Sequence, residues 1–173
     1  MYSLRLRSVR QSRRMEVFYE RFEKTLIKLA PYLKRIGYDR LEKPVAALER
    51  GVKGLLFDCQ MCGQCALSST GMSCSMNCPK NLRNGPCGGV RANGHCEVKP
   101  EMKCVWVQAW EGSQRMAGGM AILDVQKPVD NRLKGHSSWL KVVLEKTEPP
   151  PPENKNQEKP KAAPKAPAKA SAS

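Results

Sequence analysis

The stretch Cys59-Gln-Met-Cys62-Gly-Gln-Cys65 decides how this chain folds, because it sets three thiols at three-residue steps within one short loop. Five further cysteines follow it, and none lies elsewhere in the chain: Cys74, Cys78, Cys87, Cys96 and Cys104. Cysteine in its ordinary role as a small buried apolar residue would be scattered along the sequence. In a reducing compartment such a block is more typical of metal ligands than of disulfides, so metal bonds would replace a missing apolar core.

The spacing of the first three cysteines favours an iron-sulfur cluster over zinc. Tetrahedral zinc usually takes CxxC pairs from two separate loops, whereas a [4Fe-4S] cluster commonly takes CxxCxxC together with a distant cysteine that precedes a proline. Cys78, followed by Pro79, supplies such a cysteine. Gly63 would let the backbone approach the inorganic sulfides. We therefore expect a [4Fe-4S] cluster to be bound by Cys59, Cys62, Cys65 and Cys78.

Four cysteines remain after this assignment, so all eight are candidate metal ligands. A second cluster, a zinc ion or simple packing as thiols would each account for Cys74, Cys87, Cys96 and Cys104. The segment NLRNGPCGG at residues 81–89 is either a glycine-dependent turn or a loop whose amides and Arg83 face a cofactor or partner. His95, beside Cys96, would replace a thiolate at zinc, although a lone surface histidine is the simpler interpretation.

Two amphipathic helices are predicted before the cysteine block. Between residues 15 and 36 the apolar residues recur at three- and four-residue steps, and Pro31 is expected to end or kink this helix. Gly37 then breaks the pattern, and a second helix is expected to start at Pro44, which suits a first-turn position. These helices expose apolar stripes with few partners in the chain, so we expect them to form part of an interface.

Together these features predict an α+β fold: a small irregular cysteine-rich metal-binding domain preceded by the two amphipathic helices. The run VWVQAW after Cys104 is typical of a short strand or a helix start, and short ordered segments are expected at 121–125 and 139–144. The proline-, lysine- and alanine-rich end of the chain predicts a disordered basic C-terminal tail. The expected divisions are a disordered basic arm at 1–14, a helical segment at 15–57, the cysteine-rich domain at 58–145 and the tail at 146–173.

Composition limits the function classes open to the chain. With 173 residues, 6% aromatic residues and a mean hydropathy of -0.53, a large self-sufficient core is not expected. A (β/α)8 barrel needs at least about 200 residues and a repeated strand-helix pattern, and neither is present. No apolar run approaches the roughly 18 to 20 residues of a membrane span, so we expect a cytoplasmic protein that does not bind membranes.

The formal net charge of +14 raises the alternative of a basic zinc-binding nucleic-acid protein. Residues 1–50 carry 13 Lys and Arg against 6 Asp and Glu, and residues 146–173 carry 6 Lys against 3 Glu, so the excess is strongest at the two ends. The cysteine block lacks both a CxxC…HxxxH finger and an interleaving of arginine with aromatic residues. A nucleic-acid partner is therefore not favoured.

The sequence around the cysteines resembles that of a known family. The run LLFDCQMCGQCALSSTGMSCSMNCPKNLRNGPCGG at 55–89, continued by CEVKPEMKCVW at 96–106, resembles the cysteine-rich C-terminal domain associated with methylenetetrahydrofolate reductase. The resemblance covers about residues 42–110, and KPVDNRLKGHSSWL at 127–140 is similar as well. Ser75 stands where the family usually has proline, which should relax the loop without removing a ligand. The family's cysteine motifs are matched by Cys59, Cys62, Cys65 and Cys78.

This resemblance implies a non-catalytic subunit of an oxidoreductase complex. One or two [4Fe-4S] clusters would pass electrons to or from the flavin of a methylenetetrahydrofolate reductase catalytic subunit, in one-carbon (tetrahydrofolate) metabolism. A ferredoxin or another electron carrier would be a further partner. The family's catalytic barrel is absent from this chain, so its flavin and folate sites are not carried over. The alternative is a structural zinc-binding subunit that stabilises the reductase without carrying electrons.

Overall fold

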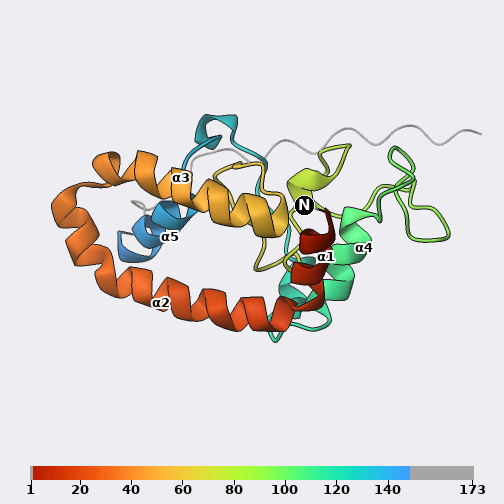
Figure 1. Cartoon of the computed structure of the whole chain (residues 1–173), viewed down its shortest axis with the longest axis horizontal. Helices are drawn as coiled ribbons and strands as arrows, with labels where there is room; N and C mark the ends of the chain where they lie inside the picture. Colours follow the sequence, from red (N-terminus) through yellow and green to blue (C-terminus); the bar gives the residue numbers. More distant parts are fainter. Residues whose placement is uncertain (1, 149–173) are drawn as a thin grey trace, which may run out of the picture.

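The computed structural model describes residues 2–148, which form a long helical hairpin with an irregular, loop-rich part at one end (Figure 1). The tail predicted from residue 146 therefore lies, from residue 149 onward, outside the described residues. In chain order the α-helices and single-turn 3-10 helices (η) are α1 Tyr2–Arg10, α2 Ser12–Ile36, α3 Tyr38–Phe57, η1 Ser75–Asn77, α4 Val105–Ser113, η2 Gly119–Leu123, η3 Asn131–Leu133 and α5 Ser138–Thr147.

The predicted α+β fold is wrong, because residues 2–148 form helices and loops without a strand. Antiparallel pairing in this range is limited to two isolated bridges, Val90 with Cys96 and His95 with Lys103. Glycine and proline interrupt this segment every few residues, so neither bridge extends into a ladder. The run VWVQAW, where the sequence allowed a strand or a helix start, opens α4.

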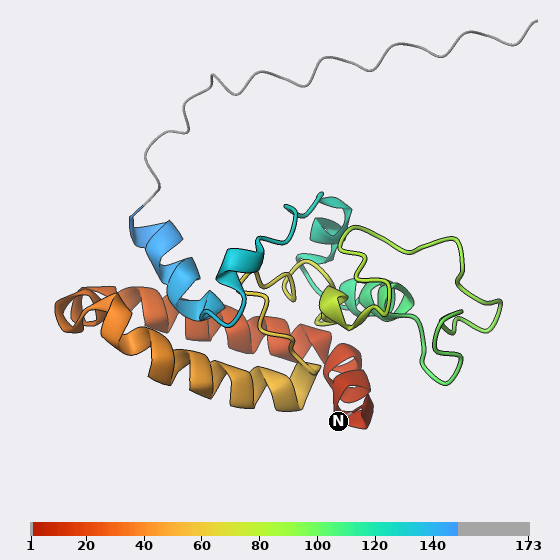
Figure 2. The same cartoon turned by 90° about the horizontal axis from the view of Figure 1, so that it is seen from above.

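Helices α2 and α3 form the hairpin, and α5 packs against both of them (Figure 2). The turn between α2 and α3 is made by Gly37, whose φ of 98° favours glycine. Helix α2 does not end at Pro31, and α3 begins at Tyr38 rather than at Pro44. Each proline removes one backbone hydrogen bond, and the helix packing on either side sustains the helix through it.

Residues 2–10, expected to be part of a disordered basic arm, form helix α1. This helix packs against α3 and against α4 (Figure 1). Ser8 Oγ donates a hydrogen bond to Leu56 O at 2.9 Å, and Ser12 Oγ donates one to Gly112 O at 2.8 Å. These bonds tie the start of the chain to the helix that precedes the cysteine block and to the helix that follows it.

Glu16 on α2 clamps the loop that follows α4. Its buried carboxylate accepts hydrogen bonds from the backbone N of Ala117 at 2.9 Å and of Gly118 at 2.8 Å, and from Arg13 Nη1 at 2.7 Å. Burial acts to raise the pKa of Glu16, but these hydrogen bonds lower it below its ordinary value. The clamp is therefore strongest when Glu16 is ionised.

The apolar core is small, as the composition predicts. One cluster lies between the end of α3 and the loop after the CxxCxxC motif and consists of Phe57, Leu67, Met72 and Met116. A second lies at the start of α4 and consists of Cys104, Trp106 and Ala109. In the part of the chain that the structure describes, no helix combines the length and apolar character that a membrane crossing requires.

Candidate functional site

Four cysteines meet around one space, which we call the cysteine cavity. It lies where α3 leads into the loops, and its thiols come from the loop after α3 and from the residue before η1: Cys59, Cys62, Cys65 and Cys74. The cavity opens to solvent and is small, with a volume of about 20 Å³. The fold therefore gathers the CxxCxxC motif and one later cysteine in one place, as a four-thiol site requires.

Left-handed residues carry the chain around this cavity after α3 ends. Asp58, Met61 and Gly63 have φ values of 55°, 48° and 70°. The Met61 backbone N–H donates to Cys59 Sγ at 3.3 Å, and hydrogen bonds of this kind tune a metal-bound sulfur. A Cβ atom at Gly63 would lie 2.3 Å from Leu133 O, so glycine is required at the point where the segment around η3 covers the loop.

Cys74, and not Cys78, lines the cavity beside the three cysteines of the CxxCxxC motif. Cys74 immediately precedes η1 and lines the cavity, whereas Cys78 immediately follows η1 and does not line it. The single turn of η1 therefore separates the two thiols. Cys78 is buried elsewhere in the loops, with 9% of its surface exposed. The later cysteine that the CxxCxxC motif needs is thus available from position 74.

Burial controls the protonation of the cavity thiols. It raises the pKa of Cys59, and together with the charges of the neighbouring cysteines it raises the pKa of Cys74 to about 12. Without a cation to bind, both groups are neutral thiols at neutral pH, whereas the form that ligates a metal is the thiolate. Loading a cation here must therefore release protons.

A buried ion pair on α3 forms one wall of the cavity. Lys53 Nζ donates to Glu49 Oε1 at 2.7 Å and to Ser138 Oγ, also at 2.7 Å, and it lies 5.2 Å from the centroid of the Trp139 ring. Burial acts to lower the pKa of Lys53, but the negative charges of Cys65 and Glu49 raise it above its ordinary value. Lys53 is therefore a fixed positive charge beside the Cys65 thiol.

The remaining cysteines belong to the distal lobe, our name for residues 78–104. Cys96 and Cys104 are buried, and Cys104 packs against Trp106 in the second core cluster. Cys87 is half-buried, and its Sγ donates to Glu97 Oε1 at 3.9 Å. None of these three thiols lines the cysteine cavity. Their proposed role as ligands of a second centre stays a prediction.

The described residues contain no compact single-ion site. His95 Nδ1 lies 2.7 Å from Pro100 O, so its ring braces a turn of the distal lobe. Across residues 2–148, no three His, Cys, Asp or Glu side chains gather closely enough to hold one metal ion.

Arg83 fixes a turn of the segment 81–89, and its expected role toward a cofactor or partner stays a prediction. Its side chain donates through Nη2 to Gln64 O and through Nε to Lys127 O, each at 2.8 Å, so it fixes a turn. Arg83 also lines the cysteine cavity. The turn therefore holds a guanidinium against the loop that carries Cys62 and Cys65.

An apolar groove of about 720 Å³ runs between α2 and α3. Phe18 and Leu48, on opposite sides of it, are 68% and 62% exposed, which confirms the exposed apolar stripes predicted for these helices. Cys65 and Lys53 line both the groove and the cysteine cavity. Because Cys65 is also exposed, the groove leads from solvent directly to one of the four thiols.

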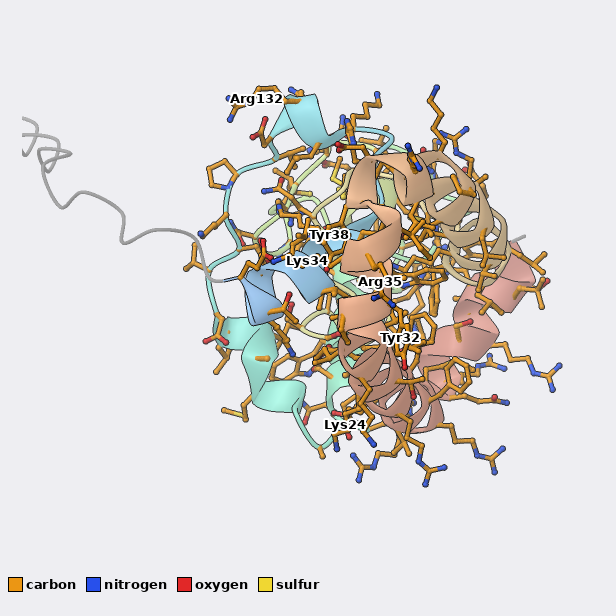
Figure 3. The ribbon with its side chains drawn as sticks, turned by 90° about the vertical axis from the view of Figure 1, so that its left-hand side faces the viewer. Lys24, Tyr32, Lys34, Arg35, Tyr38 and Arg132 are labelled. Atoms are coloured by element: carbon orange, nitrogen blue, oxygen red, sulfur yellow. The ribbon has the colours of Figure 1, made fainter. Side chains whose placement is uncertain are left out.

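The side of the molecule at the hairpin end carries both basic and aromatic side chains. Figure 3 labels the residues on this side as Lys24, Tyr32, Lys34, Arg35, Tyr38 and Arg132. Lys34 pairs with Glu148, and Arg132 pairs with Asp130 at 2.7 Å. The hydrogen bonds from Arg132 lower the pKa of Asp130 to about 2. Two of these cations are thus already balanced by acids of the same chain.

Comparison with known proteins finds a matching family. The family model described as methylene-tetrahydrofolate reductase C terminal matches residues 38–132, which is more than half of the chain. The match begins at α3 and ends in η3, so it includes the four cavity cysteines and excludes α1, α2 and α5. It confirms the resemblance found in the sequence. No curated protein and no solved structure matches the chain.

Proposed function

Since this chain belongs to the methylene-tetrahydrofolate reductase C-terminal family, we propose that it is the non-catalytic iron-sulfur subunit of a methylenetetrahydrofolate reductase complex in one-carbon metabolism. When bound, a [4Fe-4S] cluster supplies one-electron transfer. The observation that carries the proposal is the meeting of four thiols around one cavity: Cys59, Cys62, Cys65 and Cys74.

The donor set fits a cluster. In a zinc site, four sulfurs meet at one ion with Zn–S distances of about 2.3 Å, so they crowd together. In a cubane each thiolate binds a different iron, so the sulfurs stand around a larger body. Three of the four cavity cysteines have the CxxCxxC spacing, and the Met61 N–H donates to Cys59 Sγ. The spacing supports a cluster over a structural zinc ion.

Lys53 would supply the positive charge that such a site needs. A cluster held by four thiolates carries a net negative charge, and it would stand near the C-terminal end of α3. The partial negative charge of a helix C-terminus disfavours an anion there. Lys53, on the last turns of the same helix, lies at the cavity wall and offsets that charge. Its bonds to Glu49 and Ser138 keep it in place.

We assign the groove between α2 and α3 to the flavin-bearing catalytic subunit. The groove is apolar and exposed, and it ends on Cys65, the exposed member of the four thiols. A protein seated there would reach the cysteine cavity at a sulfur and would exclude water from it. Electrons would then enter or leave through Cys65, with a ferredoxin or another carrier as the second redox partner.

Metal and sulfide analysis of the full chain tests the cluster. After anaerobic purification or reconstitution with iron and sulfide, we expect about four irons and four sulfides per chain, as a [4Fe-4S] centre requires, with broad visible absorption that bleaches on reduction. A colourless protein that contains stoichiometric zinc after the same treatment would overturn this proposal and favour the structural zinc subunit.

Co-purification with the flavin-containing catalytic subunit tests the groove. We expect Leu48→Asp to weaken the complex about tenfold or more, because a charge replaces an apolar contact in a desolvated interface. Met120→Asp is the matched control, since Met120 is 73% exposed and does not line the groove. Equal affinities of the two variants would place the catalytic subunit elsewhere on the chain.

A further inference from the structure

A row of cations borders the groove between α2 and α3 on its α2 side. Its members are all exposed and follow one another at seven-residue steps: Arg14, Arg21, Lys28 and Arg35. Residues seven apart lie on nearly the same side of an α-helix, because two turns take about 7.2 residues. Arg14 lines the groove itself, and Arg35, at the other end of this basic row, is labelled in Figure 3. The basic row therefore follows the edge of the groove along α2.

The basic row stands directly beside an apolar stripe of the same helix. Each of its members is followed at once by an apolar residue: Met15, Phe22, Leu29 and Ile36. Phe18 is exposed, and its ring stacks on that of Phe22 with the centroids 6.5 Å apart. Helix α2 therefore presents an apolar stripe edged with positive charge, as a surface that binds an amphipathic helix does.

The chain does not balance the charge of the basic row with acids of its own. Neighbouring cations of α2 are paired, since Arg13 binds Glu16 at 2.7 Å and Lys34 binds Glu148. Among residues 2–148, no ion pair includes a member of the basic row. The positive charge at this edge of the groove is therefore available to a partner.

The opposite edge of the groove, on α3, carries no such charge. Helical spacing places uncharged, exposed residues beside the ones that line the groove there: Pro44, Gly51 and Leu55. The exposed cations Lys43 and Arg50 lie on the other face of α3 and do not line the groove. The two edges therefore differ, and a bound helix needs negative charge only on the side that meets α2.

Charge and shape decide what can fill the groove. A second copy would bring like charge, since residues 12–57 carry 11 Lys and Arg against 6 Asp and Glu. Residues 149–173 carry 5 Lys against 2 Glu and contain no Leu, Ile, Val, Phe or Met to fill an apolar groove. The groove is a hollow that also reaches Trp139 of α5, which a flat lipid surface does not fit. A protein helix with an acidic side fits both.

We infer that the groove takes an acidic amphipathic helix of the catalytic subunit, whose carboxylates meet the basic row and whose apolar side meets Phe18 and Leu48. This inference rests on the proposed function, which assigns the groove to that subunit. At 1.5 Å per residue, the row spans about 21 Å from Arg14 to Lys28, the length of about four helical turns. The charges steer the approaching helix, and the apolar contacts hold it once it is seated.

The first test reverses the charge of the basic row in the full-length chain. One variant combines three substitutions in the row: Arg14→Glu, Arg21→Glu and Lys28→Glu. The matched control makes the same change in net charge on faces of α2 and α3 away from the groove: Lys24→Glu, Lys43→Glu and Arg50→Glu. At low salt we expect association with the flavin-containing catalytic subunit to slow about tenfold or more for the row variant, and about threefold or less for the control.

Salt separates the two kinds of contact in the same experiment. High salt should bring the association rate of the row variant close to that of the wild type, because exposed charges are screened. Leu48→Asp should instead speed dissociation at every salt concentration, because it removes an apolar contact. Equal slowing of the row variant and its control would overturn the inference, since net charge alone would then explain the effect.

Two designed peptides test the groove without the catalytic subunit. Each forms an amphipathic helix of about 18 residues with a leucine side, and one has Glu and the other Lys at seven-residue steps beside it. We expect the chain to bind the Glu peptide about tenfold more tightly, and we expect the row variant to lose this preference. Equal binding of the two peptides, or displacement of the Glu peptide by vesicles of anionic lipid, would overturn the inference. If the Glu peptide binds and the catalytic subunit does not, the proposed function fails and the preference for an acidic helix stands.

Discussion

The cysteine cavity and the distal lobe each contain cysteines from the same short block, yet only the cavity brings four of them together. In the cavity, the end of α3 and three left-handed residues turn the CxxCxxC loop back toward Cys74. In the distal lobe, Cys104 is absorbed into a small apolar cluster and Cys87 sits beside Glu97. A dense run of cysteines therefore does not define a site until a rigid element aims them.

The two regions also differ in how they treat charge. The cavity has a buried ion pair, Glu49 with Lys53, whose side chains are at most 4% exposed. The distal lobe has an exposed one, Lys80 with Glu97, whose side chains are each 40% exposed. Buried pairs lose much when one partner is removed, and exposed pairs lose little. Changes at the buried pair of the cavity should therefore cost more stability than changes at the exposed pair of the distal lobe.

The largest effect is expected at Cys74 and Cys78, because only one of them is needed as the fourth ligand of the cluster. Cys74→Ser should remove most of the bound iron and sulfide, whereas Cys78→Ser should retain them, because Cys74 lines the cavity and Cys78 does not. Iron and sulfide per chain after anaerobic reconstitution measure this. If Cys78→Ser loses the metal and Cys74→Ser keeps it, the loops rearrange around the cluster and the ligand set expected from the sequence is the right one.

Breaking the buried ion pair should be the next most severe change. Lys53→Met leaves Glu49 buried without its partner, so we expect the metal-free chain to lose about 3–5 kcal/mol of unfolding free energy in urea. Lys43→Met, at an exposed position of the same helix, serves as the control. Adding Glu49→Gln to Lys53→Met should recover part of the loss. A change no larger than that of the control would mean that the pair is solvated.

Each region contains a glycine with positive φ, and the two glycines differ in how closely neighbouring atoms pack against them. Gly63→Ala should cost about 1–2 kcal/mol for the left-handed backbone and about 1–3 kcal/mol more for the clash of its Cβ with Leu133 O. Gly94→Ala in the distal lobe should carry the backbone cost alone, since the nearest atom to its Cβ would be a Val107 methyl at 3.8 Å. Thermal midpoints of the two variants check this, and equal shifts would show that the η3 segment can move away.

Glu16 on α2 holds the loop that follows α4, and its contribution to the free energy of unfolding should depend on pH. We expect Glu16→Gln to lower the free energy of unfolding by about 1.5 kcal/mol at neutral pH, because hydrogen bonds to a charged acceptor are lost. Since the folded-state pKa of Glu16 is lowered, its contribution is complete above the ordinary value of 4.5 and disappears as the pH falls through the folded value.

This contribution is measured by the urea midpoints of the wild type and of Glu16→Gln at several pH values between neutral and acid. The difference between the wild type and Glu16→Gln should shrink as the solution becomes more acidic. Glu20→Gln, at an exposed position of α2, should show neither the loss nor the convergence. A wild-type advantage that persists at the lowest pH would show that Glu16 acts through packing and not through its charge.

The smallest effect is expected from the exposed pair of the distal lobe. Glu97→Gln removes the partner of Lys80, and the thermal midpoint should stay close to that of the wild type, because solvent and salt screen such pairs. The comparison is made at low and at high salt. A large drop that high salt does not abolish would mean that the distal lobe is held together by this pair.

The sequence predicted the parts of the fold that depend on local pattern. The three- and four-residue spacing of apolar residues predicted two helices, and Gly37 predicted the break between them. It did not predict that residues 2–10 form helix α1, because that helix is held by packing against α3 and α4 and by the bond from Ser8 Oγ to Leu56 O, all far away in the chain. The strand alternative at VWVQAW failed because a short apolar run fits a buried helix equally well.

The sequence predicted the CxxCxxC motif of the candidate site, but it did not predict which other residues line the cavity. The rule that favours a cysteine before proline selected Cys78, and only the single turn η1 shows that Cys74 faces the cavity. Glu49 and Lys53 were missed as well. They stand four residues apart within the apolar pattern of α3, and charged residues inside such a pattern are the signal that would have indicated a buried pair.

Cys65 has an exposed thiol where the groove meets the cavity. This exposure determines how the protein withstands dioxygen when no partner is bound. A thiolate that oxygen can reach is oxidised first to sulfenic acid and then further, and a cluster loses a ligand when that happens. Of the four cavity cysteines, Cys65 is the one fully open to such attack. A partner seated in the groove would shelter that sulfur from dioxygen, so the chain would keep its centre longest when it is assembled.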